Sequence, residues 1–239
     1  MNHWGRVFFI YDSSLNLLQV KAQPLENHVG NCGIILDKFR KSYFHDHTKQ
    51  RLMQAVSLHD EGKKQTFKIQ FSDNNKQKDK TGKKDKPQKL SYSFSGHRFI
   101  VPGKDIYIDG LIRSHHEFSV EQINREKAKL PEQDKKTFAD DLYLLCMSDH
   151  LEAELAVKTV ENKTENPRNF MEFVTVPLEN KVFSVIPWPF EPDSFPVTFE
   201  LKELDLAGLN LNNPKNIEKA LKLNTDFKTE TIKIFLRRD

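Results

Sequence analysis

Residues 58–63 read Leu-His-Asp-Glu-Gly-Lys and close a predicted amphipathic helix. The adjacent His59 and Asp60 offer one imidazole nitrogen and two carboxylate oxygens, a donor set that suits first-row divalent metals. The carboxylate of Asp60 can bridge two ions, and Gly62 is expected to let the backbone turn sharply so that Lys63 points back at the site. These six residues therefore predict a metal site at the end of a helix.

Two further polar residues interrupt the predicted apolar faces of helices. His28 lies in a helical stripe of apolar residues after Pro24, and Asp149 lies in a long helix predicted to begin at Asp134. A single histidine on an apolar face is commonly an ordinary core residue, but an unpaired buried carboxylate carries a large free-energy cost. Asp149 is therefore expected to face a cation, a hydrogen-bond network or a metal ion.

The composition excludes several classes of protein. Of the 239 residues, 37% are hydrophobic and 30% are charged, and no apolar run approaches the roughly 20 residues of a membrane-spanning helix. The apolar run near the N-terminus is too short for a signal peptide, and two cysteines, Cys32 and Cys146, cannot form a disulfide framework. We therefore expect a cytoplasmic protein rather than a secreted, membrane-spanning or fibrous one.

Positive charge is concentrated in one part of the chain. Residues 61–89 contain ten lysines and four acidic residues, a balance of +6, whereas the whole chain carries +3. Within this part, residues 72–91 are polar and nearly devoid of apolar side chains, which predicts a flexible insertion. A solvated loop is one interpretation, and contact with nucleic-acid phosphates is the other. The lysines predicted to bind nucleic acid are Lys76, Lys78, Lys80, Lys83, Lys84 and Lys86.

The remaining pattern predicts β-structure at both ends of the chain. Residues 6–21 alternate around a central turn and predict a β-hairpin. Beyond residue 163 the sequence predicts strands over 170–176, 181–186, 196–201 and 230–236 and one short helix over 213–223. We therefore expect a helical domain over residues 1–162, which carries the hairpin and the Lys-rich insertion, and a β-rich C-terminal region over residues 163–239.

In order along the chain, His28, His59-Asp60 and Asp149 resemble the H…HD…D signature of the HD-domain metal-dependent phosphohydrolases. The resemblance covers roughly residues 20–160. It implies an HD-domain helical core. Together with the strands predicted outside the match, this gives an expected mainly α fold that carries a β-rich N-terminal hairpin and a C-terminal β/α appendage.

Further motifs narrow the resemblance to the CRISPR-associated HD nucleases. Residues 24–28, Pro-Leu-Glu-Asn-His, look like the entry helix of that family, and residues 58–63 are similar to its central motif. His97 and the adjacent pair His115-His116 look like the additional histidines that bind a second metal ion there. Neighbouring residues on a helix diverge by about 100°, so His115 and His116 can both bind only where the backbone is irregular or the ions lie between them.

The resemblance implies a site for two divalent metal ions. One ion would be held by His28, His59, Asp60 and Asp149. The other would be held by Asp60, His97, His115 and His116. Because imidazole is a softer donor than oxygen, Mn, Ni, Fe or Co is expected in preference to Mg, which remains possible. The predicted catalytic residues are Asp60 and Lys63, with Lys63 supplying a positive charge beside the scissile phosphate.

The function implied by the resemblance is that of a DNA endo- and exonuclease, a stand-alone subunit that degrades single strands in type I CRISPR interference. The sequence has no GxxxxGK[ST] phosphate-binding loop, so a separate helicase subunit or a CRISPR surveillance complex is the expected source of single strands. The alternatives are an HD-family nucleotide phosphohydrolase or phosphodiesterase and a non-catalytic nucleic-acid-binding subunit. The Lys-rich insertion favours an extended polyanion as substrate, and the complete set of ligands favours catalysis.

Overall fold

The computed structural model describes residues 1–72, 89–117, 119–160, 176–178, 181–183 and 188–238. The α-helices are α1 (Leu25–Lys38), α2 (Lys49–Leu58), α3 (Lys63–Thr66), α4 (Ile106–Ser114), α5 (Val120–Ala128), α6 (Glu132–Lys135), α7 (Phe138–Val160) and α8 (Pro214–Leu223). Two 3₁₀ turns are η1 (Lys41–Tyr43) and η3 (His97–Phe99). The strands are β1 (Trp4–Tyr11), β2 (Leu17–Pro24), β3 (Lys68–Phe71), β4 (Leu90–Ser93), β5 (Val176–Leu178), β6 (Lys181–Phe183), β7 (Ser194–Leu204) and β8 (Lys228–Arg237).

Strands from both ends of the chain form one antiparallel sheet in the order β1-β2-β7-β8. β2 joins the two ends, because Val20 pairs with Leu204 and Ala22 pairs with Lys202. Alternate residues of β7, beginning with Phe195 and Val197, are buried against the helices. The prediction of a mainly α core with β-rich appendages is therefore wrong. The fold is mixed α/β, and the sheet is one wall of the core.

The predicted hairpin at the N-terminus is present as β1 and β2. The Asp12 side chain builds its turn by accepting hydrogen bonds at 2.8 Å from the backbone N–H groups of both Ser14 and Asn16. Residues of β1 and β2 then pair from Tyr11 with Leu17 outward to Trp4 with Pro24. Pro24 ends the last strand of the hairpin and α1 begins at the next residue, so the hairpin fixes where α1 starts.

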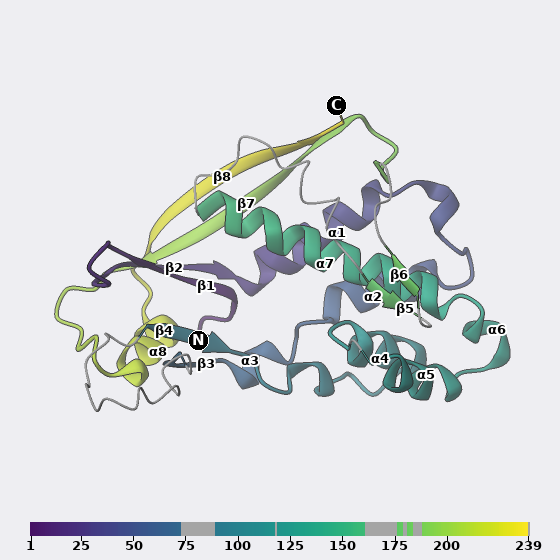
Figure 1. The fold of residues 1–239 in the computed structure, drawn as a ribbon, viewed down its shortest axis with the longest axis horizontal. Coiled ribbons are helices and arrows are strands. Elements are labelled where there is room, and N and C mark those ends of the chain that lie inside the picture. Colours follow the sequence, from purple (N-terminus) through teal and green to yellow (C-terminus); the bar gives the residue numbers. More distant parts are fainter. Residues whose placement is uncertain (73–88, 118, 161–175, 179–180, 184–187, 239) are drawn as a thin grey trace, which may run out of the picture.

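The helices pack around a pair formed by α1 and α7, which lie side by side beneath the β7–β8 ribbon in Figure 1. α2 packs against both of these helices, and α4 packs against α2 and α7 and completes the helical wall. The apolar core runs through α1, α2, α4 and α7 and includes Ile35, Leu52, Leu111 and Leu142, all with no exposed surface. No helix among the described residues combines the length and apolar character needed to cross a membrane.

Some elements differ from the sequence expectations. The long helix predicted from Asp134 is divided, because α6 ends at Lys135 and α7 begins at Phe138. The helix α4 was not predicted. Its start is fixed by Asp105, whose carboxylate accepts hydrogen bonds from the next backbone N–H groups at Tyr107 and Ile108.

The remaining predictions concern the Lys-rich insertion and the C-terminal region, parts of which lie outside the described residues. Of the predicted insertion over 72–91, residues 73–88 are not described, and the residues beside them continue as the hairpin β3–β4. Of the strand predicted over 170–176 only Val176 is described, as the first residue of β5. The strand predicted over 181–186 is described as far as residue 183, as β6, which pairs with β5. The last predicted strand and the predicted short helix are present as β8 and α8.

Asp134 supports a prediction about stability. Its nearly buried carboxylate accepts two hydrogen bonds from the Arg51 guanidinium, at 2.6 and 2.9 Å. Hydrogen bonding to Arg51 lowers the pKa of Asp134 below its usual value of 3.8. Asp134→Asn should therefore lose about 1–3 kcal/mol of unfolding free energy at neutral pH.

A lowered folded-state pKa sets the direction of the pH dependence. The stabilisation is complete above the unfolded pKa and disappears as the pH falls through the folded pKa. The free energies of urea unfolding of the wild type and of Asp134→Asn should therefore converge as the pH falls below about 4. The control is Asp37→Asn, since the Asp37 side chain is 68% exposed. A constant difference between wild type and Asp134→Asn across this range would contradict the assignment.

Candidate metal centre

The seven residues predicted as metal ligands converge on one buried cluster. His28 comes from the first turn of α1 and Asp149 from α7, while His59 and Asp60 directly follow α2. The other three ligands come from η3 and from the turn after α4; they are His97, His115 and His116. Most of the cluster is inaccessible to solvent. The His116 side chain, 34% exposed, lies at its open edge, and His97 is 13% exposed.

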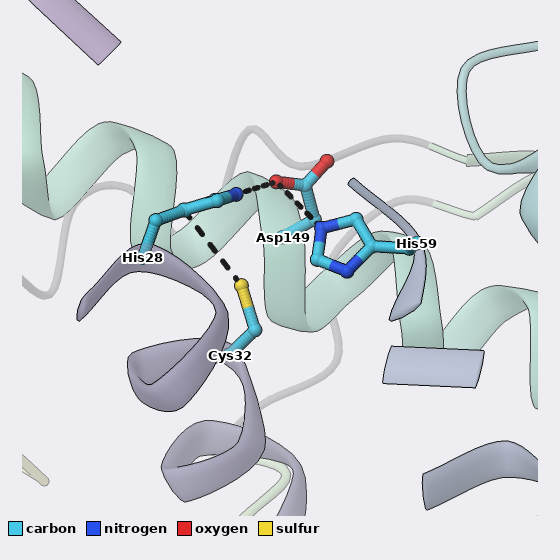
Figure 2. A group of neighbouring side chains, drawn as sticks. All are labelled: His28, Cys32, His59 and Asp149. Carbon is cyan, nitrogen blue, oxygen red and sulfur yellow. Dashed lines mark hydrogen bonds and ion pairs between the residues drawn. The ribbon is translucent and has the colours of Figure 1, made fainter. Parts of the chain in front are cut away.

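The first half of the cluster surrounds one oxygen of Asp60 and one of Asp149. The Nε2 atom of His28 lies 2.9 Å from Asp60 Oδ2 and 3.3 Å from Asp149 Oδ1. The Nε2 atom of His59 lies 3.5 Å from Asp60 Oδ2 and 3.8 Å from Asp149 Oδ1. Figure 2 shows how the two imidazoles reach Asp149 from different elements, with Cys32 one turn after His28 on α1.

The second half faces the remaining oxygens of the same two carboxylates. Asp60 Oδ1 lies 3.3 Å from His97 Nε2 and 3.8 Å from His115 Nε2. Asp149 Oδ2 lies 3.7 Å from His116 Nε2. Asp60 thus stands between the two groups of histidines, one oxygen toward each, which is the arrangement expected of a bridging carboxylate.

The adjacent histidines are accommodated by irregular backbone. His115 is the C-cap residue of α4, and both residues lie in the turn that follows the helix. Their rings lie 4.1 Å apart between centroids, yet His115 faces Asp60 and His116 faces Asp149. Because the two residues lie in a turn and not in a helix, the 100° divergence of helical neighbours does not prevent both from facing the cluster.

Three of the histidines are oriented by the backbone. The Nδ1 atoms of His59, His97 and His115 each lie within hydrogen-bond distance of the carbonyl oxygen three residues earlier, at 2.5–2.7 Å. An Nδ1–H that donates to a carbonyl leaves the Nε2 lone pair free to bind a metal. The ring orientation therefore favours ligation through Nε2 at all three positions.

The donor atoms of the cluster fit a metal ion. Among the described residues, both Asp60 oxygens and the Nε2 atoms of His28, His59, His97 and His115 are buried and make no hydrogen bond, although the Lys63 ammonium forms an ion pair with Asp60 Oδ2. Buried polar atoms rarely lack a partner. Two donors on a common ion, each about 2.0–2.2 Å from it, lie about 2.8–3.6 Å apart at bond angles between octahedral and tetrahedral values, and the contacts above span 2.9–3.8 Å. The buried histidine, aspartate and cysteine side chains can thus hold a metal ion.

The electrostatics of the cluster reflect its burial and its mixed charges. Burial opposes ionisation of Asp60, but Lys63 and neighbouring imidazoles outweigh it and hold the pKa of Asp60 well below its usual value. Burial likewise opposes protonation of His59, but Asp60 and Asp149 raise its pKa to about 10. Burial and the adjacent His115 lower the pKa of His116 to about 2. The carboxylates are therefore ionised and His116 is neutral. In the metal-free protein His59 is protonated, so a metal ion that binds its Nε2 atom must displace a proton.

Lys63 lies where the sequence motif predicts it. It begins α3, and its ammonium lies 2.5 Å from Asp60 Oδ2 and 4.9 Å from the centre of the Phe94 ring. Its side chain is 7% exposed, so the positive charge is held against the cluster rather than in solvent. Lys63 therefore adds a fixed cation beside the carboxylate that both groups of histidines share.

The role of Gly62 differs from the expectation. Its φ of −61° lies in the ordinary right-handed region, so the turn itself does not require glycine. A Cβ atom at this position would instead lie 2.1 Å from the His97 carbonyl oxygen. Glycine is required because η3 packs directly on the backbone of residue 62, and this contact places His97 in the cluster.

Sequence reasoning missed two charged residues of the site, Arg6 and Glu152. Glu152 follows Asp149 by three residues on α7, a spacing that puts both on one helix face and that could have revealed it. Arg6 comes from β1, and its Nη2 atom lies 3.8 Å from Asp149 Oδ1 and 3.6 Å from Glu152 Oε2. No local sequence signal identifies Arg6, because only the tertiary fold brings β1 to α7.

The lysines predicted to bind nucleic acid lie outside the described residues. They are Lys76, Lys78, Lys80, Lys83, Lys84 and Lys86.

Comparison of the chain with protein-family models, with curated proteins and with solved structures finds no match. The functional argument therefore rests on the site itself.

The Gly62 contact generates a prediction. Gly62→Ala should push η3 and His97 away from Asp60, which would weaken metal binding and cost about 1–3 kcal/mol of stability. Gly30→Ala on α1 is the control, because no atom lies within 4 Å of a Cβ there; this helical replacement should stabilise the protein by about 1 kcal/mol. Thermal unfolding and Mn²⁺ titration calorimetry measure both effects. Normal Mn²⁺ affinity in Gly62→Ala would show that the close approach does not position His97.

Proposed function

We propose that this protein is a metal-dependent phosphodiesterase that cleaves single-stranded DNA. The observation that carries the proposal is the position of Asp60, whose two buried oxygens face different pairs of histidines. A carboxylate between two imidazole-rich groups is the ligand arrangement of a two-metal hydrolytic site. A site that served only to stabilise the fold would need no more than one of these groups.

The donor set assigns each residue a place in the proposed centre. His28, His59, Asp60 and Asp149 would hold one ion, and Asp60, His97, His115 and His116 the other. The abundance of imidazole favours Mn, Ni, Fe or Co over Mg. When bound, a pair of such ions supplies an activated water and neutralises charge on the scissile phosphate.

The protein's own residues define how a substrate meets this centre. His116 is the most exposed of the seven ligand residues, so the phosphate is expected to approach from its side. Lys63 holds a positive charge beside Asp60, where negative charge develops on the phosphate in the transition state. The surrounding apolar core excludes bulk water, which strengthens both electrostatic effects.

The choice of substrate rests on charge. Residues 61–89 carry a balance of +6, which suits an extended polyanion better than a single nucleotide. The resemblance of residues 20–160 to CRISPR-associated HD nucleases supports single-stranded DNA and a role in CRISPR interference. In that role a separate helicase subunit, or a surveillance complex that recruits one, supplies the single strands.

Cleavage of labelled single-stranded DNA in the presence of Mn²⁺ tests the proposal directly. Asp60→Asn preserves the shape of the side chain but removes the shared negative charge, and His59→Ala removes one ligand. Both variants should reduce cleavage to the level without enzyme. His47→Ala is the control, because His47 is exposed and lies outside the cluster. Retained cleavage in Asp60→Asn and His59→Ala would refute the site, and phosphate release from free nucleotides without strand cleavage would favour a nucleotide phosphohydrolase.

The imidazole-rich donor set predicts a metal preference. Metal-free protein reloaded with Mn²⁺ or Ni²⁺ should cleave DNA faster than protein reloaded with Mg²⁺, because imidazole binds the transition metals more strongly. Initial rates at one sub-saturating metal concentration, the same for each metal, measure this difference in binding. Equal rates with all three metals would argue against ligation by histidine.

The Lys-rich segment predicts a salt dependence. Each lysine that contacts a phosphate of single-stranded DNA contributes about 0.7 to the slope of log affinity against log salt concentration. Replacement of the six lysines at 76, 78, 80, 83, 84 and 86 by serine should therefore flatten the slope. The control replaces the exposed Lys228 and Lys233 of β8. Fluorescence anisotropy over a salt series measures the slopes, and an unchanged slope would remove this segment from the DNA interface.

A further inference from the structure

His28 differs from the other buried histidines in how its ring is held. His59 and His115 are C-cap residues, and the last carbonyl groups of a helix are free to accept a hydrogen bond from Nδ1. His28 lies within α1, where backbone carbonyls are engaged in the helix. Its Nδ1 atom instead contacts Glu152 Oε2 on α7, across the α1–α7 interface.

Glu152 is itself held by a network from three elements. Its side chain has no exposed surface, and its Oε1 atom accepts hydrogen bonds from Gln23 of β2 at 2.5 Å and from Asn31 of α1 at 3.3 Å. Arg6 of β1 lies 3.6 Å from Oε2. Burial alone would raise the pKa of Glu152, but its contacts with His28, Arg6 and Gln23 lower it. The network therefore keeps a fixed carboxylate behind His28.

We infer that Glu152 is a positioning residue that fixes the tautomer and the orientation of His28, so that its Nε2 atom is presented to one of the two metal ions. A carboxylate that accepts from Nδ1–H leaves the lone pair on Nε2 and increases the basicity of the ligand. The inference rests on the proposed metal-dependent function. It adds that the N-terminal hairpin, through Arg6 and Gln23, helps set the metal affinity of the first group of ligands.

Glu152 acts on only one of the two groups. His97 and His115 are oriented by the carbonyl oxygens of Phe94 and Ile112, which a substitution at Glu152 leaves intact. A change at Glu152 should therefore weaken one metal-binding event and spare the other. A purely structural role would weaken both events or neither.

The test is a Mn²⁺ titration of the metal-free full-length protein by calorimetry. Glu152→Ala should lower the affinity of one binding event by about 10–100-fold. Glu152→Gln should produce a smaller loss, because the amide oxygen can still accept from Nδ1–H. Glu154→Gln is the matched control, since Glu154 lies on the same helix and is exposed. Nitrogen NMR of the Zn²⁺-loaded protein should show His28 with its proton on Nδ1 in the wild type and in Glu152→Gln.

Several results would overturn the inference. These are unchanged affinity in folded Glu152→Ala, equal weakening of both binding events, or the same loss in Glu154→Gln. If Glu152→Ala fails to fold, the Mn²⁺ titration of Glu152→Gln is the deciding measurement. Normal Mn²⁺ affinity in that variant overturns the inference. Wild-type protein that binds Mn²⁺ but cleaves no DNA would refute the proposed function alone, leaving the Glu152 titration to decide this inference. Failure of the wild type to bind Mn²⁺ would overturn both.

Discussion

Burial of the Asp60 carboxylate is the constraint on which the centre of this protein depends. An ionised carboxylate with no exposed surface is tolerated only when opposite charge or strong donors surround it. The fold supplies these from four segments, with Lys63 at one oxygen and histidines at both. Because all of them point at one side chain, the segments after α2, in η3 and after α4 are held close to α1 and α7.

The ends of helices explain why so many imidazoles can be oriented in a small space. α2 and α4 end beside the cluster, and their last carbonyl groups accept the Nδ1 protons of His59 and His115. The rings are fixed without additional side chains, and their Nε2 atoms converge. His28 lies in the first turn of α1, where no free helix-terminal carbonyl is available to its Nδ1 atom, so Glu152, held by Gln23 and Arg6, takes that role.

The sheet is part of this arrangement, which the sequence did not indicate. Individual strands and the N-terminal hairpin could be predicted because alternation and the turn at Asp12 are local signals. The pairing of β2 with β7 could not be predicted, because it joins residues about 180 positions apart. Arg6 was missed for the same reason. Glu152 was also missed, but it could have been identified, because it lies three residues after Asp149 on a predicted helix.

The sequence by itself determined which residues have the chemistry for a metal site: the His59-Asp60 pair, the histidines that follow, and polar residues on otherwise apolar helix faces. Donor chemistry and helical periodicity are properties of residue type and spacing, so they can be read without a fold. Only the tertiary structure decided that Asp60 lies between two groups of histidines, that Gly62 is needed for the approach of His97, and that the sheet supplies Arg6. These features depend on contacts between segments distant in sequence, and such contacts are set by the packing of the whole core.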